Sequence, residues 1–384
     1  MALDPDVFAH LLATVRRFVR ERLVPLEERV DREDTVPEAV VDEMRALGLF
    51  GLSIPERYGG LGLGLAEEAR VVFELGWTAP AFRSVVGTNV GIGSQGILLD
   101  GTEAQKEAYL PRMATGELVG SFALTEPDVG SDAASVQTRA VWDGEAYRIH
   151  GTKRWITNAP RAGVFTLMAR TGTTEERGRG VTAFLVDAAL PGIELGPPYA
   201  KMGQRGTHVC DVHLDDVRVQ AEAIIGGEPG RGFKTAMKVL DKGRIHIAAL
   251  CVGVAERVLH EMVRFGTERV QFGKPIAEHQ LVQAMIADSR AEAYAARAMV
   301  LDAARRYDAG EKVTTEAACC KLFASEMVGR VADRGVQVHG GAGYIADHAV
   351  ERLYRDVRLI RLYEGTSQIQ QLIIARNVVR DLRD

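Results

Sequence analysis

The segment YEGTSQIQ at residues 363–370 carries a carboxylate directly before a glycine. Gly365 leaves open space beside Glu364, so a ligand can come close to this carboxylate. If Glu364 faces an apolar pocket, desolvation raises its pKa towards neutrality, which suits a base that abstracts a proton. The alternative is structural, because Thr366 or Ser367 can cap the helix predicted to follow. The segment therefore indicates either a proton-abstracting base or a helix start.

A turn rich in backbone N–H groups and hydroxyls is predicted at residues 122–132, FALTEPDVGSD. A predicted strand ends at Thr125, and Pro127, Gly130 and Ser131 favour a tight turn after it. Such a turn can hold the edge of a planar heterocycle or a phosphate group. A plain hairpin loop is the alternative.

Trp155 and Thr157 belong to a strand-like segment, KRWITN, at residues 153–158. Because side chains alternate along a strand, these two are expected on the same face. An indole beside a hydroxyl suits stacking on a flavin ring and hydrogen bonding to its reactive edge. The alternative is a tryptophan that fills the core beside a surface threonine.

Two further segments follow long predicted helices. In RVQFGKP at residues 269–275, Arg269 could pair bidentately with a pyrophosphate, or could be a solvated cation at a helix end. In QVHGG at residues 337–341, adjacent glycines allow a ligand to approach the backbone closely. His339 has no second ligand at a suitable spacing, so it is interpreted as structural and no metal site is predicted.

The glycines at positions 91, 93 and 96 match the pattern G-x-G-x-x-G of dinucleotide-binding folds. That motif needs a strand before it, a helix after it and an acidic residue about 20 positions later. Here the surroundings are predicted to be helical and nothing supports a βαβ unit. We therefore interpret these glycines as positions of close helix packing.

The elements that must position these residues fall into three parts. Apolar residues recur at helical spacing in the first third and again after about Gly230, whereas short β-branched and aromatic runs lie between. Asp143-Gly144 is a hairpin signal between two of those runs. The absence of long helices among the strands favours an antiparallel β domain over a Rossmann fold, and the long final helices favour a bundle. The predicted strands are 119–125, 138–142, 147–150, 164–170, 181–186 and 208–214, and the predicted long helices are 233–266, 278–308, 313–338 and 346–358.

We therefore predict an α+β fold with an N-terminal α domain (1–118), a middle antiparallel β domain (119–229) and a C-terminal four-helix-bundle-like α domain (230–384). The 384 residues are 46% hydrophobic and 26% charged, which is a globular composition. A net charge of -5 gives no electrostatic footprint for a nucleic acid. The sequence contains no C-x-x-C pair, so neither a zinc ribbon nor a thioredoxin motif is predicted. The first residues lack the basic character of a signal or transit peptide, and the apolar run at 247–255 is too short to span a membrane. These features predict a soluble, cytoplasmic protein.

Taken together, the motifs occur in the order and approximate spacing of the FAD-dependent acyl-CoA dehydrogenases, and the chain resembles bacterial members over essentially its whole length, including residues 55–60. The resemblance implies the fold of that family, an FAD cofactor, and oxidation of a fatty, short or branched acyl-CoA to the trans-2-enoyl-CoA in lipid β-oxidation. Glu364 would remove the α-proton while a β-hydride passes to flavin N5. The backbone N–H of Glu364 and a flavin ribityl hydroxyl would stabilise the thioester oxygen. Electrons would pass to an electron-transfer flavoprotein.

The resemblance also implies roles for individual residues and a homotetramer, a dimer of dimers in which FAD sites are shared across subunits. Thr125 would bond to the pyrimidine side of the flavin, Trp155 would pack on the ring and Thr157 would reach N5. The implied FAD-binding residues are Phe122, Leu124, Thr125, Ser131, Trp155, Ile156, Thr157, Arg269, Phe272, Gln280, Gln337, Val338, His339, Gly340, Gly341, Thr366 and Gln368. The implied substrate-binding residues are Ser131, Asp241, Arg244, Tyr363, Gly365 and Arg83.

The position of the base distinguishes two branches of this family. In one branch the base lies one residue before the arginine that corresponds to Arg244, and that position is Gly243 here. Since Gly243 carries no carboxylate, the resemblance assigns the base to Glu364.

The substrate and the electron acceptor are each open to a second interpretation. Arg83-Ser84 resembles a pair in the glutaryl-CoA branch, where the arginine meets a distal carboxylate, but the acidic residue expected seven positions earlier is Gly76. A dicarboxylic acyl-CoA therefore stays an alternative substrate. An acyl-CoA oxidase is the nearest competing activity, although oxidases are usually much longer. A flavin-dependent monooxygenase or nitroalkane oxidase is a more distant one, and a DNA-associated relative would be expected to carry extra basic C-terminal sequence.

Overall fold

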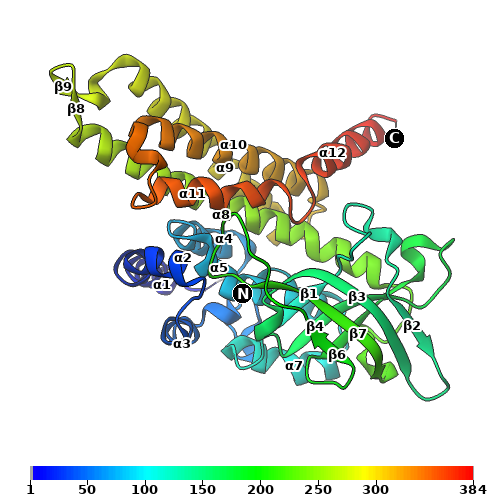
Figure 1. The fold of residues 1–384 in the computed structure, drawn as a ribbon. Helices are drawn as coiled ribbons and strands as arrows, with labels where there is room; N and C mark the ends of the chain where they lie inside the picture. The colour runs from blue at the N-terminus through cyan, green and yellow to red at the C-terminus, as the bar shows by residue number, and fades with distance from the viewer. Residues whose placement is uncertain (1–2, 384) are drawn as a thin grey trace.

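The computed structural model describes residues 3–383. Helices form the first part of the chain, a sheet the second and helices the third, and the longest helix, α8, runs between the N-terminal and C-terminal helices (Figure 1). This arrangement confirms the predicted α–β–α order, while the exact domain limits stay a prediction. Within residues 3–383 no helix combines the length and the apolarity needed to cross a membrane, and the cytoplasmic location also stays a prediction.

The N-terminal part packs its helices around a core of aliphatic and aromatic side chains. Local caps fix where helices begin: Thr102 Oγ1 accepts from the N–H of Gln105 at 3.2 Å, and the Gln105 side chain accepts from the N–H of Thr102 at 3.0 Å. The helices are α1 (Pro5–Phe18), α2 (Glu27–Glu33), α3 (Glu38–Ala46), α4 (Leu65–Leu75), α5 (Pro80–Gly87), α6 (Gln95–Asp100) and α7 (Glu103–Thr115).

The three glycines of the dinucleotide-like pattern lie in helical structure, as predicted. A π-helical segment, Thr88–Gly93, continues α5 and leads into α6. A Cβ atom on Gly93 would lie 2.7 Å from the carbonyl oxygen of Thr88 and 3.0 Å from that of Gly120. Gly93 therefore allows a strand of the sheet to approach this helix closely, and the interpretation as a packing site is confirmed for this glycine. A Cβ atom on Gly91 or Gly96 would meet its neighbours only at 3.4 Å or more.

The middle part is a mixed sheet in which most neighbours are antiparallel. Strand order is β1-β4-β2-β3-β7-β6, with β5 on β4. The Asp143-Gly144 hairpin is confirmed, since Trp142 pairs with Tyr147 across it. The strands are β1 (Gly120–Ala123), β2 (Arg139–Trp142), β3 (Tyr147–Thr157), β4 (Val164–Arg170), β5 (Val181–Asp187), β6 (Ile193–Leu195) and β7 (Val209–Val219).

The prediction of an antiparallel domain misses two parallel pairings, of β1 and of β2 with β4. The cause is the path of the chain. β1 pairs with residues 164–167 of β4, and β2 joins the same strand further on, at Arg170. The chain therefore leaves the sheet after Ala123 and rejoins it at Arg139, where β2 lies between β4 and β3. The segment between them, which contains the predicted ligand-binding turn, is displaced from the sheet.

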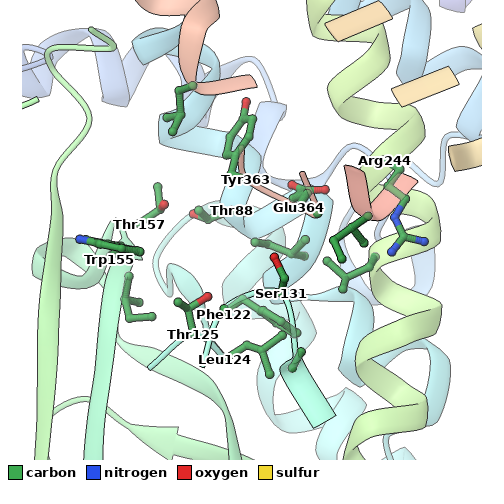
Figure 2. Close-up of a pocket in the computed structure, with 18 of the residues that line it drawn as sticks. Thr88, Phe122, Leu124, Thr125, Ser131, Trp155, Thr157, Arg244, Tyr363 and Glu364 are labelled. Atoms are coloured by element: carbon green, nitrogen blue, oxygen red, sulfur yellow. The ribbon is translucent and has the colours of Figure 1, made fainter. Parts of the chain in front are cut away.

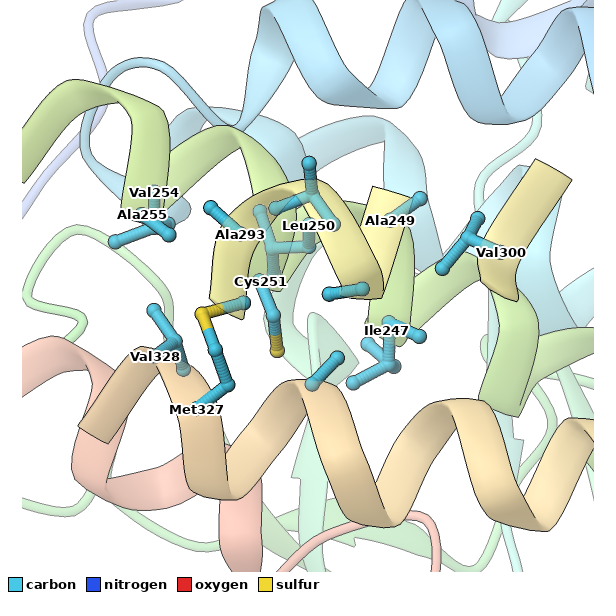
Figure 3. Packing of buried hydrophobic residues seen from close by; sticks show 14 of the residues in the cluster. Ile247, Ala249, Leu250, Cys251, Val254, Ala255, Ala293, Val300, Met327 and Val328 are labelled. Atoms are coloured by element: carbon cyan, nitrogen blue, oxygen red, sulfur yellow. The ribbon is translucent and has the colours of Figure 1, made fainter. Parts of the chain in front are cut away.

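The C-terminal part is a helical bundle with a short two-stranded tip, β8 (Val270–Gln271) and β9 (Lys274–Pro275). Ile247 and Cys251 of α8 meet Ala293 of α9 and Met327 of α10 in a core of small and flexible side chains (Figure 3). The predicted long helices are confirmed to within a few residues at each end. They are α8 (Gly232–Glu268), α9 (Gln280–Asp308), α10 (Thr314–His339) and α11 (Ala349–Val357), followed by α12 (Ser367–Asp381), which extends away from the bundle (Figure 1).

Candidate active site

A cavity of about 600 Å³ is lined by residues from all three parts of the chain. Figure 2 shows Trp155 and Thr157 of β3 on one side, Arg244 of α8 on the other, and Glu364 between them. The sheet part contributes Phe122, Leu124, Thr125, Ser131, Trp155, Ile156 and Thr157; the N-terminal part Arg83, Ser84, Gly87, Thr88 and Ile92; and the C-terminal part Met237, Leu240, Arg244, Leu359, Tyr363, Glu364 and Gly365.

Glu364 lies on a tight left-handed turn between the helical segment that follows α11 and helix α12. Its φ is 53°, and that of Gly365 is 91°, a conformation that glycine adopts without steric cost. The Gln370 amide donates to the carbonyl oxygens of Glu364 and Gly365, both at 3.1 Å, and Lys321 Nζ donates to the Gly365 oxygen at 2.7 Å. These bonds fix the turn from the side of α10 and α12.

Thr366 confirms the structural interpretation of this segment, because its hydroxyl accepts from the N–H of Ile369 at 3.2 Å and caps α12. The two interpretations of the segment are therefore compatible. The helix start holds the turn, and the turn presents Glu364 to the cavity.

The electrostatic environment of Glu364 suits a base. Burial raises the pKa of its carboxyl above the ordinary value, and the charges of Arg83, Lys321 and Arg244 partly offset that rise. Among the described residues, Glu364 Oε2 has no hydrogen-bond partner. The main-chain N–H of Glu364 likewise donates to no acceptor within residues 3–383. A carboxylate oxygen and an N–H donor are thus both available to a ligand.

Gly243 of α8 lies against this carboxylate. A Cβ atom built on Gly243 would meet Glu364 Oε2 within 3.0 Å, a separation that real Cβ atoms do not show. Position 243 and position 364 therefore lie next to each other, although about 120 residues of chain separate them. The missing side chain at Gly243 makes the room that the Glu364 carboxylate occupies.

Arg83 is only 6% exposed and lines the same cavity. Its guanidinium pairs with Nδ1 of His246, while Nε2 of His246 lies 3.2 Å from Glu68. Burial and the Arg83 charge lower the pKa of His246 to about 4, so the imidazole is neutral at physiological pH. Lys242 Nζ lies 2.8 Å from Glu68 and neutralises it. His246 therefore does not compensate the charge of Arg83, and that charge acts on Glu364, whose pKa it lowers.

A buried ion pair anchors the segment that leaves the sheet after β1. Lys153 Nζ lies 2.7 Å from Glu126, whose carboxylate also accepts from the N–H groups of Gln137 at 2.7 Å and Thr138 at 2.9 Å. This anchor ties down both ends of the turn. Ser131, at its tip, lines the cavity.

Trp155 and Thr157 both line the cavity, as predicted, but regular alternation is not the reason. Trp155 has a φ of 57°, and the pairing of β3 with β7 shifts register between Lys153 and Ile156. This bulge turns the indole outwards, so that Trp155 is 57% exposed instead of filling the core. An exposed indole beside a hydroxyl fits a planar heteroaromatic group such as a flavin. The space next to Gly130 on the cavity wall is also open, since a Cβ built there would have no atom within 4 Å.

Several predicted site residues lie outside this cavity. The β8–β9 tip exposes Phe272 by 95%, and Arg269 and Gln280 beside it are also exposed. Gln337 is exposed on the last turn of α10, and Gly340 and Gly341 are exposed directly after that helix. None of these residues lines the cavity of the same chain, and neither does the buried Val338. That they bind FAD of another subunit stays a prediction.

His339 behaves as a structural histidine. It is buried, its Nδ1 lies 2.8 Å from the Gly335 carbonyl oxygen, and its ring stacks on Phe265 with centroids 4.3 Å apart. No group of three or more potential ligands within residues 3–383 could hold a metal ion. The contact of His339 with FAD stays a prediction.

Two further predicted site residues lie outside the cavity. Asp241 does not line the cavity; it holds Arg244 at 2.7 Å and accepts from Thr314 at 2.7 Å. Gln368 is exposed on the first turn of α12 and also lies outside the cavity. Asp241 therefore orients a residue that lines the cavity.

Sequence patterns do not point to three residues that shape the site. Thr88 and Gln204 line the cavity, and Lys321 supports the turn of Glu364 from α10. Lys321 has one usable signal, because it follows AACC in an otherwise apolar helical stretch where a charge must be buried. Thr88 and Gln204 lie in segments with no comparable pattern.

Three family profiles match consecutive parts of the chain. The acyl-CoA dehydrogenase N-terminal domain matches residues 8–117, the middle domain residues 121–217 and the C-terminal domain residues 230–379. Among curated proteins, a probable acyl-CoA dehydrogenase of Bacillus subtilis (strain 168) is 41% identical over 366 residues, which cover 95% of this chain and 96% of that protein. An acryloyl-CoA reductase (NADH) of Anaerotignum propionicum is 41% identical over 368 residues, covering 95% and 92%.

Solved structures show the same similarity. Butyryl-CoA dehydrogenase from Megasphaera elsdenii superposes with a TM-score of 0.94 at 33% identity, covering 99% of this chain and 100% of that chain. A chain from the structure of the electron transferring flavoprotein of Acidaminococcus fermentans, described in connection with flavin-based electron bifurcation, superposes with a TM-score of 0.95 at 34% identity and covers 99% and 100%.

Proposed function

Because this chain belongs to the acyl-CoA dehydrogenase family of FAD-dependent oxidoreductases, we propose that it dehydrogenates an acyl-CoA thioester between Cα and Cβ, with Glu364 as the base. The observation that carries this proposal is the Glu364 carboxylate, which lines the cavity with a raised pKa and with one oxygen free of partners in residues 3–383.

The chemistry requires more than a base, since the α-proton of a thioester is too weakly acidic to leave unless the enolate is stabilised as it forms. The N–H of Glu364, which has no acceptor in residues 3–383, is the proposed donor to the thioester oxygen. Glu364 Oε2 takes the proton from Cα, and the turn held by Gln370 and Lys321 keeps the donor and the base together. FAD, when bound, supplies the acceptor for the β-hydrogen.

The residues proposed to hold the flavin ring are those of the displaced turn and the β3 bulge. Phe122, Thr125, Trp155 and Thr157 line the cavity on the side of the sheet, opposite the α8 residues. Trp155 offers an exposed ring for stacking, and the two threonines offer hydroxyls for hydrogen bonds. Ser131 lies at the tip of the turn, where it is proposed to contact the CoA portion of the substrate.

The proposed substrate is a short or branched acyl-CoA. Its acyl group would occupy the part of the cavity lined by Ser84, Gly87, Thr88 and Ile92, where the buried Arg83 limits the room for an apolar chain. The similarity to a butyryl-CoA dehydrogenase and to an acryloyl-CoA reductase supports a short chain. The name of the second relative describes reduction of an enoyl-CoA, which is the reverse of the dehydrogenation proposed here.

A second candidate substrate is an acyl-CoA with a distal carboxylate, as in the glutaryl-CoA branch. The observation that favours it is Arg83, a buried cation on the cavity wall whose partner His246 is neutral. Comparing kcat/KM for butyryl-, octanoyl- and glutaryl-CoA separates the two. Selective use of glutaryl-CoA, lost in Arg83→Met, supports the second candidate, and no preference for it ends that idea.

The proposed electron acceptor is an electron-transfer flavoprotein, and the proposed assembly is a homotetramer. The structural similarity to a chain from the structure of such a flavoprotein supports the first. The exposure of Phe272, Leu281 and Tyr344, at 95%, 82% and 84%, supports a partner subunit over the β8–β9 tip and the end of α10. Rapid peroxide production under air would instead favour an oxidase.

The decisive experiment is anaerobic bleaching of the bound flavin by a panel of acyl-CoAs, in the wild type and in Glu364→Gln. The variant preserves the shape of the side chain but removes the base, so it should stay yellow and lose bleaching by every substrate. Glu261→Gln serves as a control, because it changes a buried carboxylate that does not line the cavity, and it should keep the bleaching. Bleaching of Glu364→Gln at the wild-type rate contradicts the proposal.

A further inference from the structure

Lys321 of α10 is a fully buried lysine with no ion-pair partner in the described chain. Its side chain is 0% exposed, and no carboxylate within residues 3–383 lies within 4.0 Å of it. Its Nζ donates to the carbonyl oxygen of Gly365 at 2.7 Å. Gly365 directly follows Glu364, so this cation supports the turn that carries the proposed base.

Burial of an unpaired ammonium is expensive, and a methionine of similar volume would avoid that cost. Burial lowers the pKa of Lys321 to about 8, which still leaves the amine mainly protonated at neutral pH. A charge kept in this position, against its desolvation cost, indicates a role that a neutral side chain does not fill.

Three buried cations surround Glu364, and Lys321 differs from the other two. Arg83 and Arg244 line the cavity, so a ligand can touch them, and each has its own partner, His246 or Asp241. Lys321 does not line the cavity. It can therefore affect the reaction only through the turn and through its field.

We propose that Lys321 is a positioning residue for the base: it holds the left-handed turn by the Gly365 carbonyl, and its charge keeps the Glu364 carboxylate ionised at neutral pH. This inference rests on the proposed role of Glu364. The charged and titratable groups that face the pair are Arg83 of α5, Arg244 and Cys251 of α8, Glu326 of α10 itself, and Tyr363 beside the base.

The structure provides a matched control for this role. Gln370 of α12 donates to the same Gly365 oxygen at 3.1 Å, and also to the Glu364 oxygen, but it carries no charge. Lys321→Met and Gln370→Met each remove a donor to Gly365, whereas only Lys321→Met removes a positive charge near Glu364.

The first measurement is the pH profile of kcat/KM for the FAD-loaded enzyme. On the acidic limb of this profile, kcat/KM rises with pH as Glu364 loses its proton. In Lys321→Met this limb should move to higher pH, because loss of a nearby cation disfavours the ionised form of Glu364. The rate at a pH below the limb should fall about tenfold or more, whereas the rate well above the limb should fall only about as far as in Gln370→Met, which loses a donor to the same oxygen. Lys321→Arg should restore the limb, and Gln370→Met should lower the rate at all pH values without moving it.

The second measurement needs no turnover. The infrared carbonyl band of protonated Glu364, identified by its loss in Glu364→Gln, should persist to higher pH in Lys321→Met than in the wild type. Lys321→Gln provides a second neutral variant if the methionine variant folds poorly. The inference is overturned if both neutral variants keep the wild-type position of the acidic limb and the wild-type pH range of the carbonyl band. It is also overturned if Gln370→Met shifts the limb and the band as far as Lys321→Met does.

Failure of the proposed function and failure of the role of Lys321 give different results. If Glu364→Gln retains flavin bleaching, the proposed function is wrong whatever Lys321 does. If Glu364→Gln abolishes bleaching but the limb of Lys321→Met does not move, the function stands and only the role of Lys321 is wrong.

Discussion

Replacing Gly243 with alanine should separate the stability of α8 from the activity of the site. Glycine inside a helix costs about 1 kcal/mol relative to alanine, so Gly243→Ala should by itself stabilise α8. The new Cβ would meet Glu364 Oε2 within 3.0 Å, and would lie 3.3 Å from Glu364 Cδ and 3.4 Å from Ile92. The atom in conflict is the free end of a side chain, so the carboxylate is expected to move and the helix to stay.

The size of this movement sets the expected loss of activity. Ordinary van der Waals contact begins near 3.4 Å, so Oε2 must retreat by on the order of 1 Å. A misplacement of that size can cost about 100-fold in rate, or about 2.7 kcal/mol of transition-state stabilisation. The melting temperature should stay unchanged or rise by about 2 °C, because about 1 kcal/mol of helix propensity is gained.

The assay is the rate of anaerobic flavin reduction after mixing with substrate, measured beside the thermal unfolding of the same preparation. Gly266→Ala is the matched control, because it lies on the same helix and its Cβ would meet only the Ala277 side chain at 3.3 Å and backbone atoms beyond 3.6 Å. It should keep its rate, because Gly266 does not line the cavity. A fully active Gly243→Ala variant, or one that loses rate and stability together, refutes the reasoning that the carboxylate is packed against Gly243.

Three further changes test other parts of the site. Trp155→Ala should weaken FAD binding to the apoprotein about tenfold or more in a fluorescence titration, and change the free energy of unfolding by less than about 0.5 kcal/mol, because the indole is exposed. Lys153→Met should cost about 3–5 kcal/mol in urea unfolding by stranding Glu126, and adding Glu126→Gln should recover part of it. Burial raises the pKa of Asp356 to about 7, so the native state binds more protons than the unfolded state and stability from this group falls as pH rises from about 4 to 7. Asp356→Asn should therefore be more stable relative to wild type at pH 8 than at pH 5, by about 1–4 kcal/mol in urea unfolding.

Periodicity is sufficient to predict most of the elements. The helices around residues 247 and 327 have long apolar stripes that bury against each other (Figure 3), and the hairpin at Asp143-Gly144 follows from local turn chemistry. The parallel pairings of β4 could not be predicted in this way. They depend on where the chain rejoins the sheet after the displaced turn. Tertiary packing decides that position, and the pattern of residues within a strand does not indicate it.

The candidate site shows the same division. A carboxylate next to a glycine points to Glu364, and burial raises the pKa of this carboxyl, which is the expected direction. No sequence pattern indicates that Gly243 lies against it, because that contact joins two segments far apart in the chain. The alternation rule brings Trp155 and Thr157 together for the wrong reason, since a bulge and a left-handed residue place them. Rules of local spacing do not include such irregularities.

The position of Glu364 reflects two opposed requirements. A base needs a raised pKa, which burial supplies, yet it must also be ionised when the substrate arrives. A buried carboxylate without cations would stay protonated at neutral pH, whereas one paired directly with a cation would be a weak base. Arg83, Arg244 and Lys321 influence Glu364 without forming an ion pair with it in the described chain. Cations held by other partners can therefore favour ionisation and still leave Oε2 free to accept a proton.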